Sequence, residues 1–373
     1  MEKPGNNETI PPLFQPIQVR GTSFRNRVFL SPMCQYASDE GAPTPWHSAH
    51  HSRFALGGLG GAMVESTGVT RDGRITPVCM GLWNETQEKG LSAIADIYHA
   101  QGVPVGIQLS HSGRKGSSTP PAEGGKPLSS AGPEQAWETV APSAIPLRDG
   151  WPTPKALTEA EIEDLIQAFV DAAKRAIRAG FDYVEIHGAH GYLIHSFMSP
   201  LANQRTDRWG GDLEGRMRFP LEIVKAVRKV IPENMPLFYR ASVVDGLDGG
   251  LAADDTVLLA QRLKAAGVDV IDCSSGGITG ASGKSFSEPY PGYLVDYSAQ
   301  VKREAEILTM AVGVIVSAEK ANDVIASGEA DFVAIARHHL YDPSFAYHAA
   351  EELGHPDPES LLPDSYGMVL RAR

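Results

Sequence analysis

Short apolar segments and amphipathic helical segments alternate along almost the whole chain. The apolar segments begin near residues 28, 62, 103, 183, 237, 268, 312 and 332, with helical periodicity between them. This alternation predicts strands joined by crossover helices, the connection that parallel strands require. Eight such units favour a closed (β/α)8 TIM barrel, an α/β fold. An open doubly wound sheet is the alternative, but it normally carries a GxGxxG turn after its first strand, and here Ser31-Pro32-Met33-Cys34 follows instead.

The segment after Thr158 has the strongest helical pattern. Thr158 and Glu161 have the spacing of a capping box, in which each side chain satisfies a backbone amide at the helix start. Gly180 is a plausible left-handed stop. The apolar positions between them fall on one helical face: Ile162, Leu165, Ile166, Phe169, Val170, Ala173 and Ile177.

Two segments depart from the alternation. Residues 114–157 are rich in Gly, Pro and Ser, and the strand–helix pattern resumes after them, so we expect an inserted loop region after the third strand of a single domain spanning 1–373. Residues 354–373 are expected to form a C-terminal tail. Near the end of the barrel, the seventh strand is predicted at Val312–Val316 and the eighth at Phe332–Ile335.

Composition excludes several classes of protein. With 42% hydrophobic residues and 21% charged residues, the chain is neither collagen-like nor disordered, and its net charge of −12 argues against a nucleic-acid or anionic-membrane partner. It has no apolar run of about 18 residues, and Met1 to Pro12 lacks the apolar core of a signal peptide. Cys34, Cys79 and Cys273 are odd in number and widely spaced, so no disulfide framework is expected and a cytoplasmic location is the default.

Polar side chains recur where each predicted strand ends. Active sites of TIM barrels form at this end of the barrel. The candidates, in chain order, are Cys34 and Tyr36; Glu65, Ser66 and Thr67; Gln108, His111, Arg114 and Lys115; His187, His190 and Tyr192; Arg240 and Ser242; Ser274 to Gly277; and Ser317 and Arg337.

Two arginines in this set point to a phosphate. Arg240 and Arg337 follow the fifth and eighth strands, and Gly276-Gly277 follows the sixth. The last strands of such barrels often hold a phosphate through backbone amides and a basic side chain. A phosphate-bearing cofactor or substrate is therefore one reading, and structural ion pairs are the other.

His187, His190 and Tyr192 lie on one turn after the fourth strand. Two imidazoles can donate hydrogen bonds to one carbonyl oxygen and stabilise negative charge that develops there, while the phenol can supply a proton. A metal site is disfavoured, because HExxH is absent and no third ligand is spaced nearby. No metal is therefore expected.

Other reactive side chains carry weaker signals. His47, His50 and His51 lie on a predicted helix, but no carboxylate or cysteine completes a metal site there, so a structural or rim role is favoured. Cys34 could be a nucleophile, which would need a base beside it, or a buried thiol that faces a cofactor.

Five motifs are shared with one known family: Ser31-Pro32-Met33-Cys34-Gln35-Tyr36, Gln108-Leu109, Arg114-Lys115, His187-Gly188-Ala189-His190-Gly191-Tyr192, and the run from Ser199 to Gly211. The chain resembles the Old Yellow Enzyme family from about Leu13 to Leu340, and within it the thermophilic-like bacterial branch with Cys after Ser-Pro-Met. The resemblance implies an FMN-containing barrel, an ene-reductase that reduces activated alkenes with NADPH or NADH.

The resemblance also implies roles for individual residues. The backbone of Ser31, Pro32, Met33 and Cys34 would lie along the flavin, with Ser66 beside the ring. Tyr36, His187 and His190 would bind substrate, and Tyr192 would donate the proton. The remaining cofactor contacts would come from Gln108 and Arg240 at the ring and from Gly313, Ala336 and Arg337 at the phosphate.

Two positions depart from the family. Ala336 stands where the family usually has Gly, and Arg371 and Arg373 are spaced differently from the family's C-terminal arginine. By resemblance we expect a homo-oligomer, a dimer or a tetramer, acting on a small activated alkene. The alternatives are a lyase, for which Lys115 is a poor Schiff-base candidate, a non-enzymatic flavin-binding scaffold, and a dienoyl-CoA reductase-like protein, which would need a cysteine cluster and a second nucleotide domain.

Overall fold

Eight parallel strands close into a barrel in the computed structural model, which describes residues 9–129, 135–279 and 289–372. The strands follow one another around the barrel in chain order, and the last pairs with the first. They are β3 (Val28–Leu30), β4 (Gly61–Gly68), β5 (Val105–Ser110), β8 (Tyr183–Gly188), β9 (Leu237–Ser242), β10 (Val270–Ser274), β11 (Leu308–Ala311) and β12 (Phe332–Ile335). The predicted TIM barrel is confirmed.

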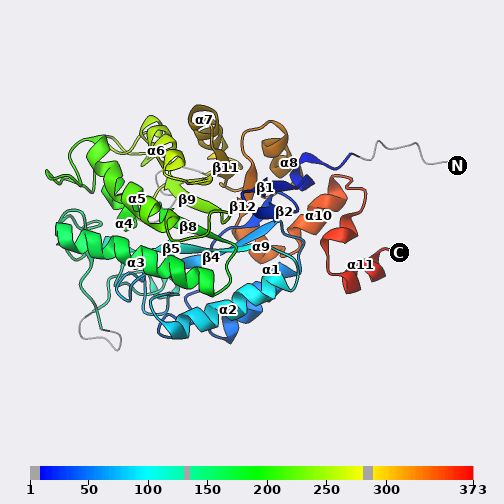
Figure 1. The fold of residues 1–373 in the computed structure, drawn as a ribbon, viewed down its shortest axis with the longest axis horizontal. Coiled ribbons are helices and arrows are strands. Elements are labelled where there is room, and N and C mark those ends of the chain that lie inside the picture. The colour runs from blue at the N-terminus through cyan, green and yellow to red at the C-terminus, as the bar shows by residue number, and fades with distance from the viewer. Residues whose placement is uncertain (1–8, 130–134, 280–288, 373) are drawn as a thin grey trace.

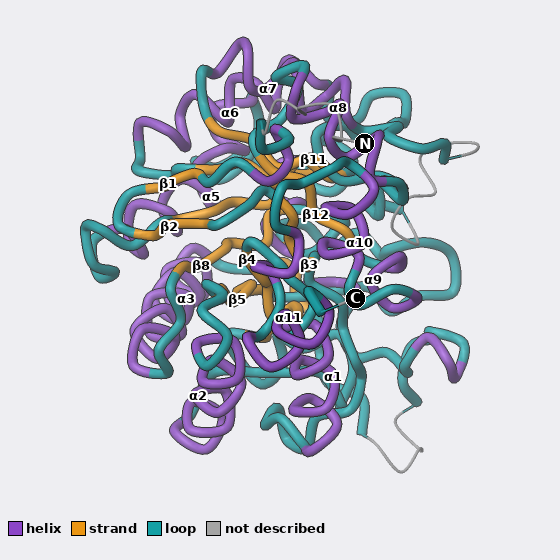
Figure 2. The backbone as a smooth tube through the Cα atoms, turned by 90° about the vertical axis from the view of Figure 1, so that its right-hand side faces the viewer, coloured by secondary structure: helices purple, strands orange, loops and turns teal. Residues whose placement is uncertain are grey.

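Helices surround the strands on all sides, as Figures 1 and 2 show. In the described part of the chain none is long and apolar enough to cross a membrane. They are α1 (Pro45–Ala55), α2 (Glu85–His99), α3 (Glu159–Arg178), α4 (Leu193–Met198), α5 (Leu213–Arg228), α6 (Ala253–Ala265), α7 (Val295–Ala305), α8 (Ala318–Ala326), α9 (Arg337–Tyr341), α10 (Phe345–Glu352) and α11 (Asp364–Leu370). Short 3-10 helices cover Pro12–Phe14, Gly113–Lys115, Pro121–Glu123 and Pro358–Leu361.

Helix α3 begins as its sequence predicts. Thr158 Oγ1 accepts from the Glu161 amide at 3.3 Å, and Glu161 Oε2 accepts from the Thr158 amide at 2.9 Å. Ile162 and Phe169 are buried on the face toward the barrel. The reciprocal bonds satisfy two amides that would otherwise have no partner at the helix start.

The seventh strand lies earlier than predicted. It is β11, Leu308–Ala311, and Val312–Val316 is a loop that follows it. Gly313 (φ 111°) and Val314 (φ 56°) have positive φ, which extended chain does not allow. The apolar run at Val312–Val316 therefore lines a cavity at the end of the barrel, as described below.

An N-terminal hairpin, which the sequence did not predict, covers the opposite end of the barrel. Strands β1 (Ile17–Val19) and β2 (Thr22–Phe24) pair antiparallel. The ring of Phe24, fully buried, lies 5.1 Å from that of Phe29, 5.6 Å from Tyr183 and 5.5 Å from Phe332. Because these partners stand on β3, β8 and β12, one aromatic side chain ties the hairpin to three strands at their N-terminal half.

The inserted region is held to the loop between α4 and α5. Its two short strands, β6 (Val140–Ala141) and β7 (Lys155–Ala156), pair parallel. Arg205 donates to the carbonyls of Pro142, at 2.9 Å, and Leu157, at 2.5 Å. In the C-terminal tail, Arg371 pairs with Asp357 of its own chain at 3.0 Å, and Arg373 lies outside the described residues.

Candidate active site

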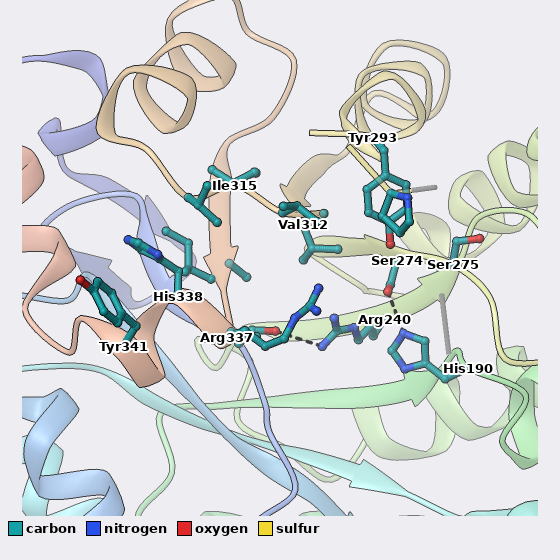
Figure 3. A pocket seen from close by; sticks show the side chains of 18 residues that line it. His190, Arg240, Ser274, Ser275, Tyr293, Val312, Ile315, Arg337, His338 and Tyr341 are labelled. Carbon is teal, nitrogen blue, oxygen red and sulfur yellow. Dashed lines mark hydrogen bonds between the residues drawn. The ribbon is translucent and has the colours of Figure 1, made fainter. Parts of the chain in front are cut away.

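A cavity of about 1090 Å³ opens at the C-terminal ends of the strands. Figure 3 shows its walls, which come from β9, β10, β12 and the loop after β11. Eight of the predicted site residues line it: Ser31, His190, Arg240, Ser274, Ser275, Gly313, Ala336 and Arg337. The size suits a nucleotide-sized ligand, since such sites typically measure about 300–1,000 Å³.

Arg240 supplies a buried cation at one side of the cavity. Its NH1 donates to Ser31 Oγ at 3.4 Å, and its Nε lies 3.3 Å from Asp272 Oδ2 without hydrogen-bond geometry. Arg240 also lines the cavity, so an acceptor on a ligand can approach the guanidinium from the cavity side.

Arg337, at the start of α9, and Gly313, in the loop after β11, also line the cavity. Gly313 has a φ of 111°, and a Cβ there would lie 3.2 Å from the Leu294 amide and the Tyr293 ring. Ala336, which stands where the family usually has Gly, also lines the cavity. Arg240 and Arg337 give the cavity two cationic side chains, which fits FMN, because FMN carries an anionic phosphate and an electron-poor ring.

Gln108 contacts Glu185, a buried carboxyl close enough to Arg240 for the charge of Arg240 to affect it. Its Nε2 donates to Glu185 Oε1 at 2.7 Å. Burial, followed by the charge of Asp272, raises the pKa of Glu185 to about 8. At neutral pH the Glu185 carboxyl is therefore mostly protonated, so it cancels little of the positive charge of Arg240.

The two histidines face each other after β8. His187 Nε2 and His190 Nδ1 are 3.4 Å apart, and the second ring nitrogen of His190, Nε2, lies 2.7 Å from Ser274 Oγ. Burial, and then the charge of Arg240, holds the pKa of both imidazoles well below the usual range. Both rings are therefore neutral, and each can donate from only one nitrogen at a time.

Tyr192 packs edge-on against this pair, with ring centroids 5.0 Å from His187 and 6.5 Å from His190. The Lys115 ammonium lies 5.0 Å from the Tyr192 ring centroid and donates to the His190 carbonyl at 2.8 Å. Burial raises the pKa of Tyr192 well above its usual value. The phenol therefore holds its proton at neutral pH.

Cys34 and Tyr36 lie near the same group. Burial, followed by the charge of Glu65, raises the pKa of the Cys34 thiol well above its usual value. Burial also raises the pKa of Tyr36, with a smaller contribution from a hydrogen bond to Cys34. A nucleophilic cysteine needs the opposite shift, so for the half-buried Cys34 a thiol that stays protonated is better supported than a nucleophile.

Several predicted residues do not line the cavity itself. Ser66 is buried in β4, next to the register shift between Val64 and Thr67, and Gln108 is buried in β5. The other residues with roles implied by the resemblance that lie outside the cavity wall are Pro32, Met33, Cys34, Tyr36, His187 and Tyr192. His190 contacts both His187 and Tyr192, and so connects this second group to the cavity.

The histidines of α1 have structural roles, as favoured. The Thr44 amide donates to His47 Nδ1 at 3.0 Å, and His47 Nε2 faces Glu65 Oε1 at 3.5 Å. Glu65 Oε2 in turn accepts from the Gln35 amide at 2.9 Å. Among the described residues, no group of His, Cys, Asp and Glu could hold a metal ion.

Sequence reasoning missed a buried hydrogen-bond network that holds the turn carrying His187, His190 and Tyr192. The Gly191 amide donates to His195 Nδ1 at 2.8 Å, and His195 Nε2 lies 2.9 Å from Asp245 Oδ1. Ser199 also donates to Asp245, at 2.6 Å. Although burial opposes ionisation, these hydrogen bonds leave the pKa of Asp245 below its usual value. The i, i+4 spacing from Gly191 to His195 was the one local signal for this contact.

The fold and the site define a class: a TIM-barrel oxidoreductase built around a flavin nucleotide. A family model described as NADH:flavin oxidoreductase / NADH oxidase matches residues 12–355. The chain belongs to this family, and the Old Yellow Enzyme resemblance is confirmed. Its cofactor is FMN and its reductant is NADH or NADPH.

Individual relatives agree with this assignment. The NADPH dehydrogenase of Geobacillus sp. (strain WCH70) is 43% identical over 344 residues, which cover 92% of this chain and 94% of that protein. Morphinone reductase superposes with a TM-score of 0.76 at 26% identity, covering 97% of this chain and 96% of that one. A 2-naphthoyl-CoA reductase superposes with a TM-score of 0.81 at 26% identity, but the match spans 94% of this chain and only 53% of that one.

Proposed function

We propose that this enzyme reduces activated alkenes, such as α,β-unsaturated carbonyl compounds, at the expense of NAD(P)H. The observation that carries the proposal is the group of His187, His190 and Tyr192, two neutral imidazoles and a protonated phenol in mutual contact beside Arg240. Two relatives named for reductions, morphinone reductase and 2-naphthoyl-CoA reductase, support a reductive role.

Bound FMN supplies hydride exchange between the nicotinamide and the alkene. His187 and His190 bind the carbonyl oxygen of the substrate and draw electron density from the double bond, so that its β-carbon accepts hydride. Their N–H groups then stabilise the enolate oxygen as charge develops there. Tyr192 delivers a proton to the α-carbon. Tyr36 borders the substrate on the side of Cys34.

The cofactor contacts form part of the proposal. Arg240 and Gln108 would hold the electron-poor edge of the ring, and the backbone of Ser31, Pro32, Met33 and Cys34, with Ser66, would lie along it. Gly313, Ala336 and Arg337 would hold the phosphate. The lyase alternative is disfavoured, because Lys115 is engaged with the carbonyls of His190 and Gly277 and packs on Tyr192.

The test uses the histidine pair and a phenol. p-Hydroxybenzaldehyde, bound to the oxidised holoenzyme, is expected to give a long-wavelength charge-transfer band through its phenolate oxygen on the two imidazoles. His187→Ala/His190→Ala should abolish the band and slow enone reduction by at least about 10²-fold, the cost of losing such donors. His99→Ala, on the surface of α2, is the matched control. A normal band and normal turnover in the double variant would exclude the proposal.

A further inference from the structure

The proton on His187 has a fixed position. The Ala189 amide donates to His187 Nδ1 at 3.2 Å, so this nitrogen is an acceptor and the proton of the neutral ring is on Nε2. Nε2 points at His190 Nδ1, 3.4 Å away. With no ligand between the rings, His187 Nε2–H donates to His190 Nδ1, and His190 carries its own proton on Nε2.

That arrangement does not suit a substrate oxygen. His190 Nδ1 would present a lone pair to the carbonyl oxygen, and only His187 would donate. For both rings to donate to one oxygen, His190 must carry its proton on Nδ1, and its Nε2 must then accept a hydrogen bond. Without a donor at Nε2, the required tautomer leaves a buried nitrogen with no partner.

The required donor is present on β10. Ser274 Oγ lies 2.7 Å from His190 Nε2, and Figure 3 shows this bond at the cavity wall. A hydroxyl can accept from Nε2–H or donate to Nε2, since its hydrogen rotates. The His190 amide is held separately, donating to Ser242 Oγ at 2.9 Å, so the turn keeps its position whichever tautomer the ring adopts.

We propose that Ser274 is a positioning residue that holds His190 in the Nδ1–H tautomer when a substrate oxygen is bound, so that both imidazoles donate to it. The ring keeps one proton throughout, and only the position of that proton changes. This inference rests on the proposed function, because it assumes that the substrate oxygen binds between His187 and His190.

Affinity for p-hydroxybenzaldehyde, titrated through its charge-transfer band, is the first test. Ser274→Ala should weaken binding about tenfold, the effect of one lost hydrogen bond to a buried group. Ser274→Thr keeps the hydroxyl and should restore affinity to within about twofold. Ser110→Ala is the matched control, because Ser110 is a buried serine at the end of β5 whose hydroxyl has no hydrogen-bond partner.

The tautomer can be observed directly with ¹⁵N-labelled histidine, with the His190 signals assigned by their loss in His190→Asn. In the phenol complex we expect His190 Nδ1 protonated and Nε2 unprotonated, and in Ser274→Ala a larger share of Nε2–H. The inference is overturned if His190 carries its proton on Nε2 in the complex, or if Ser274→Ala leaves both affinity and tautomer unchanged.

His190→Asn separates this inference from the function on which it rests. An Asn amide donates without any tautomer choice, so adding Ser274→Ala to His190→Asn should cost nothing further. If the band depends on His187 and His190 but not on Ser274, the inference fails and the proposed function stands. If the band is independent of both histidines, the proposed function itself fails.

Discussion

Tyr192 shares a turn with His187 and His190, and the proposed reaction gives the three side chains different roles. The imidazoles are neutral donors to oxygen, whereas burial keeps the phenol protonated at the α-carbon side of the proposed substrate position. A group that only protonates carbon has no part in the reduction of the flavin by NAD(P)H, so its removal should affect one half-reaction.

Tyr192→Phe should therefore slow enone reduction by about 10²- to 10⁴-fold, the usual contribution of a proton donor. Flavin reduction by NADPH should remain near the wild-type rate. Stopped-flow measurement of each half-reaction tests this directly. A wild-type rate of enone reduction in the variant would show that solvent or another residue supplies the proton.

Lys115, which donates to the His190 carbonyl, should make a pH-dependent contribution to the stability of the folded protein. Burial, followed by the charges of Arg114 and Arg148, lowers the pKa of its ammonium from 10.5 to about 7. Between these values the unfolded chain holds a proton at Lys115 that the folded chain has released. The unfolded state then binds more protons, so the contribution of Lys115 to stability rises with pH across this window.

Comparison with Lys115→Met isolates this contribution. The difference in free energy of unfolding, wild type minus variant, should increase from about pH 7 to about pH 10 and be constant below pH 7. Urea unfolding of both proteins at matched pH measures it. A difference that stays flat over the whole range would mean that the Lys115 pKa is not lowered.

At the scale of elements, the sequence predicted features that depend on neighbouring residues and missed features that depend on contacts between distant segments. The capping box of α3 and its buried face are local and were predicted from sequence. The end of β11 was placed wrongly, because an apolar run at Val312–Val316 resembles a strand although the positive φ of Gly313 and Val314 turns it into a cavity wall. The hairpin β1–β2 was missed because three-residue strands give almost no periodicity.

The α3 cap predicts a stability change without a functional one. Thr158→Ala removes the side-chain acceptor for the Glu161 amide and should lower the free energy of unfolding by about 1 kcal/mol. Enone turnover should be unaffected, since α3 lies outside the cavity. Thr86→Ala, at an exposed position in the first turn of α2, where Asn84 is the cap, is the control that carries the same change of residue. Equal urea midpoints for the two variants would contradict the role of the cap.

At the scale of the whole molecule, the barrel brings residues far apart in sequence to one cavity, and this is where prediction from sequence ended. The repeat of strand and helix predicted the barrel, and strand ends predicted His187, His190, Arg240 and Arg337 as site candidates. Nothing local couples His190 to Ser274, 84 residues away. Such pairs depend on how neighbouring strands are aligned, and this alignment cannot be predicted from a single sequence.

FMN should also contribute to the stability of the whole barrel, because the folded chain binds it and the unfolded chain does not. FMN at 100 times its Kd adds about 2.7 kcal/mol, enough to raise Tm by several degrees. Arg337→Ala should retain less FMN on purification and gain less Tm from the same FMN concentration. Arg303→Ala, on the exposed side of α7, is the control. Full occupancy and an unchanged gain in Arg337→Ala would remove Arg337 from the phosphate contacts.

Phe24 and its hairpin fill the N-terminal end of the barrel with aromatic rings. The nicotinamide and the alkene should therefore both reach the flavin through the cavity at the C-terminal strand ends, and one should have to leave before the other enters. The enzyme should therefore work by strict turns, releasing NADP⁺ or NAD⁺ before the alkene enters, and each reactant should compete with the other at high concentration. Double-reciprocal plots against NADPH at several fixed enone concentrations should then be parallel; lines that intersect would mean that both reactants occupy the barrel together.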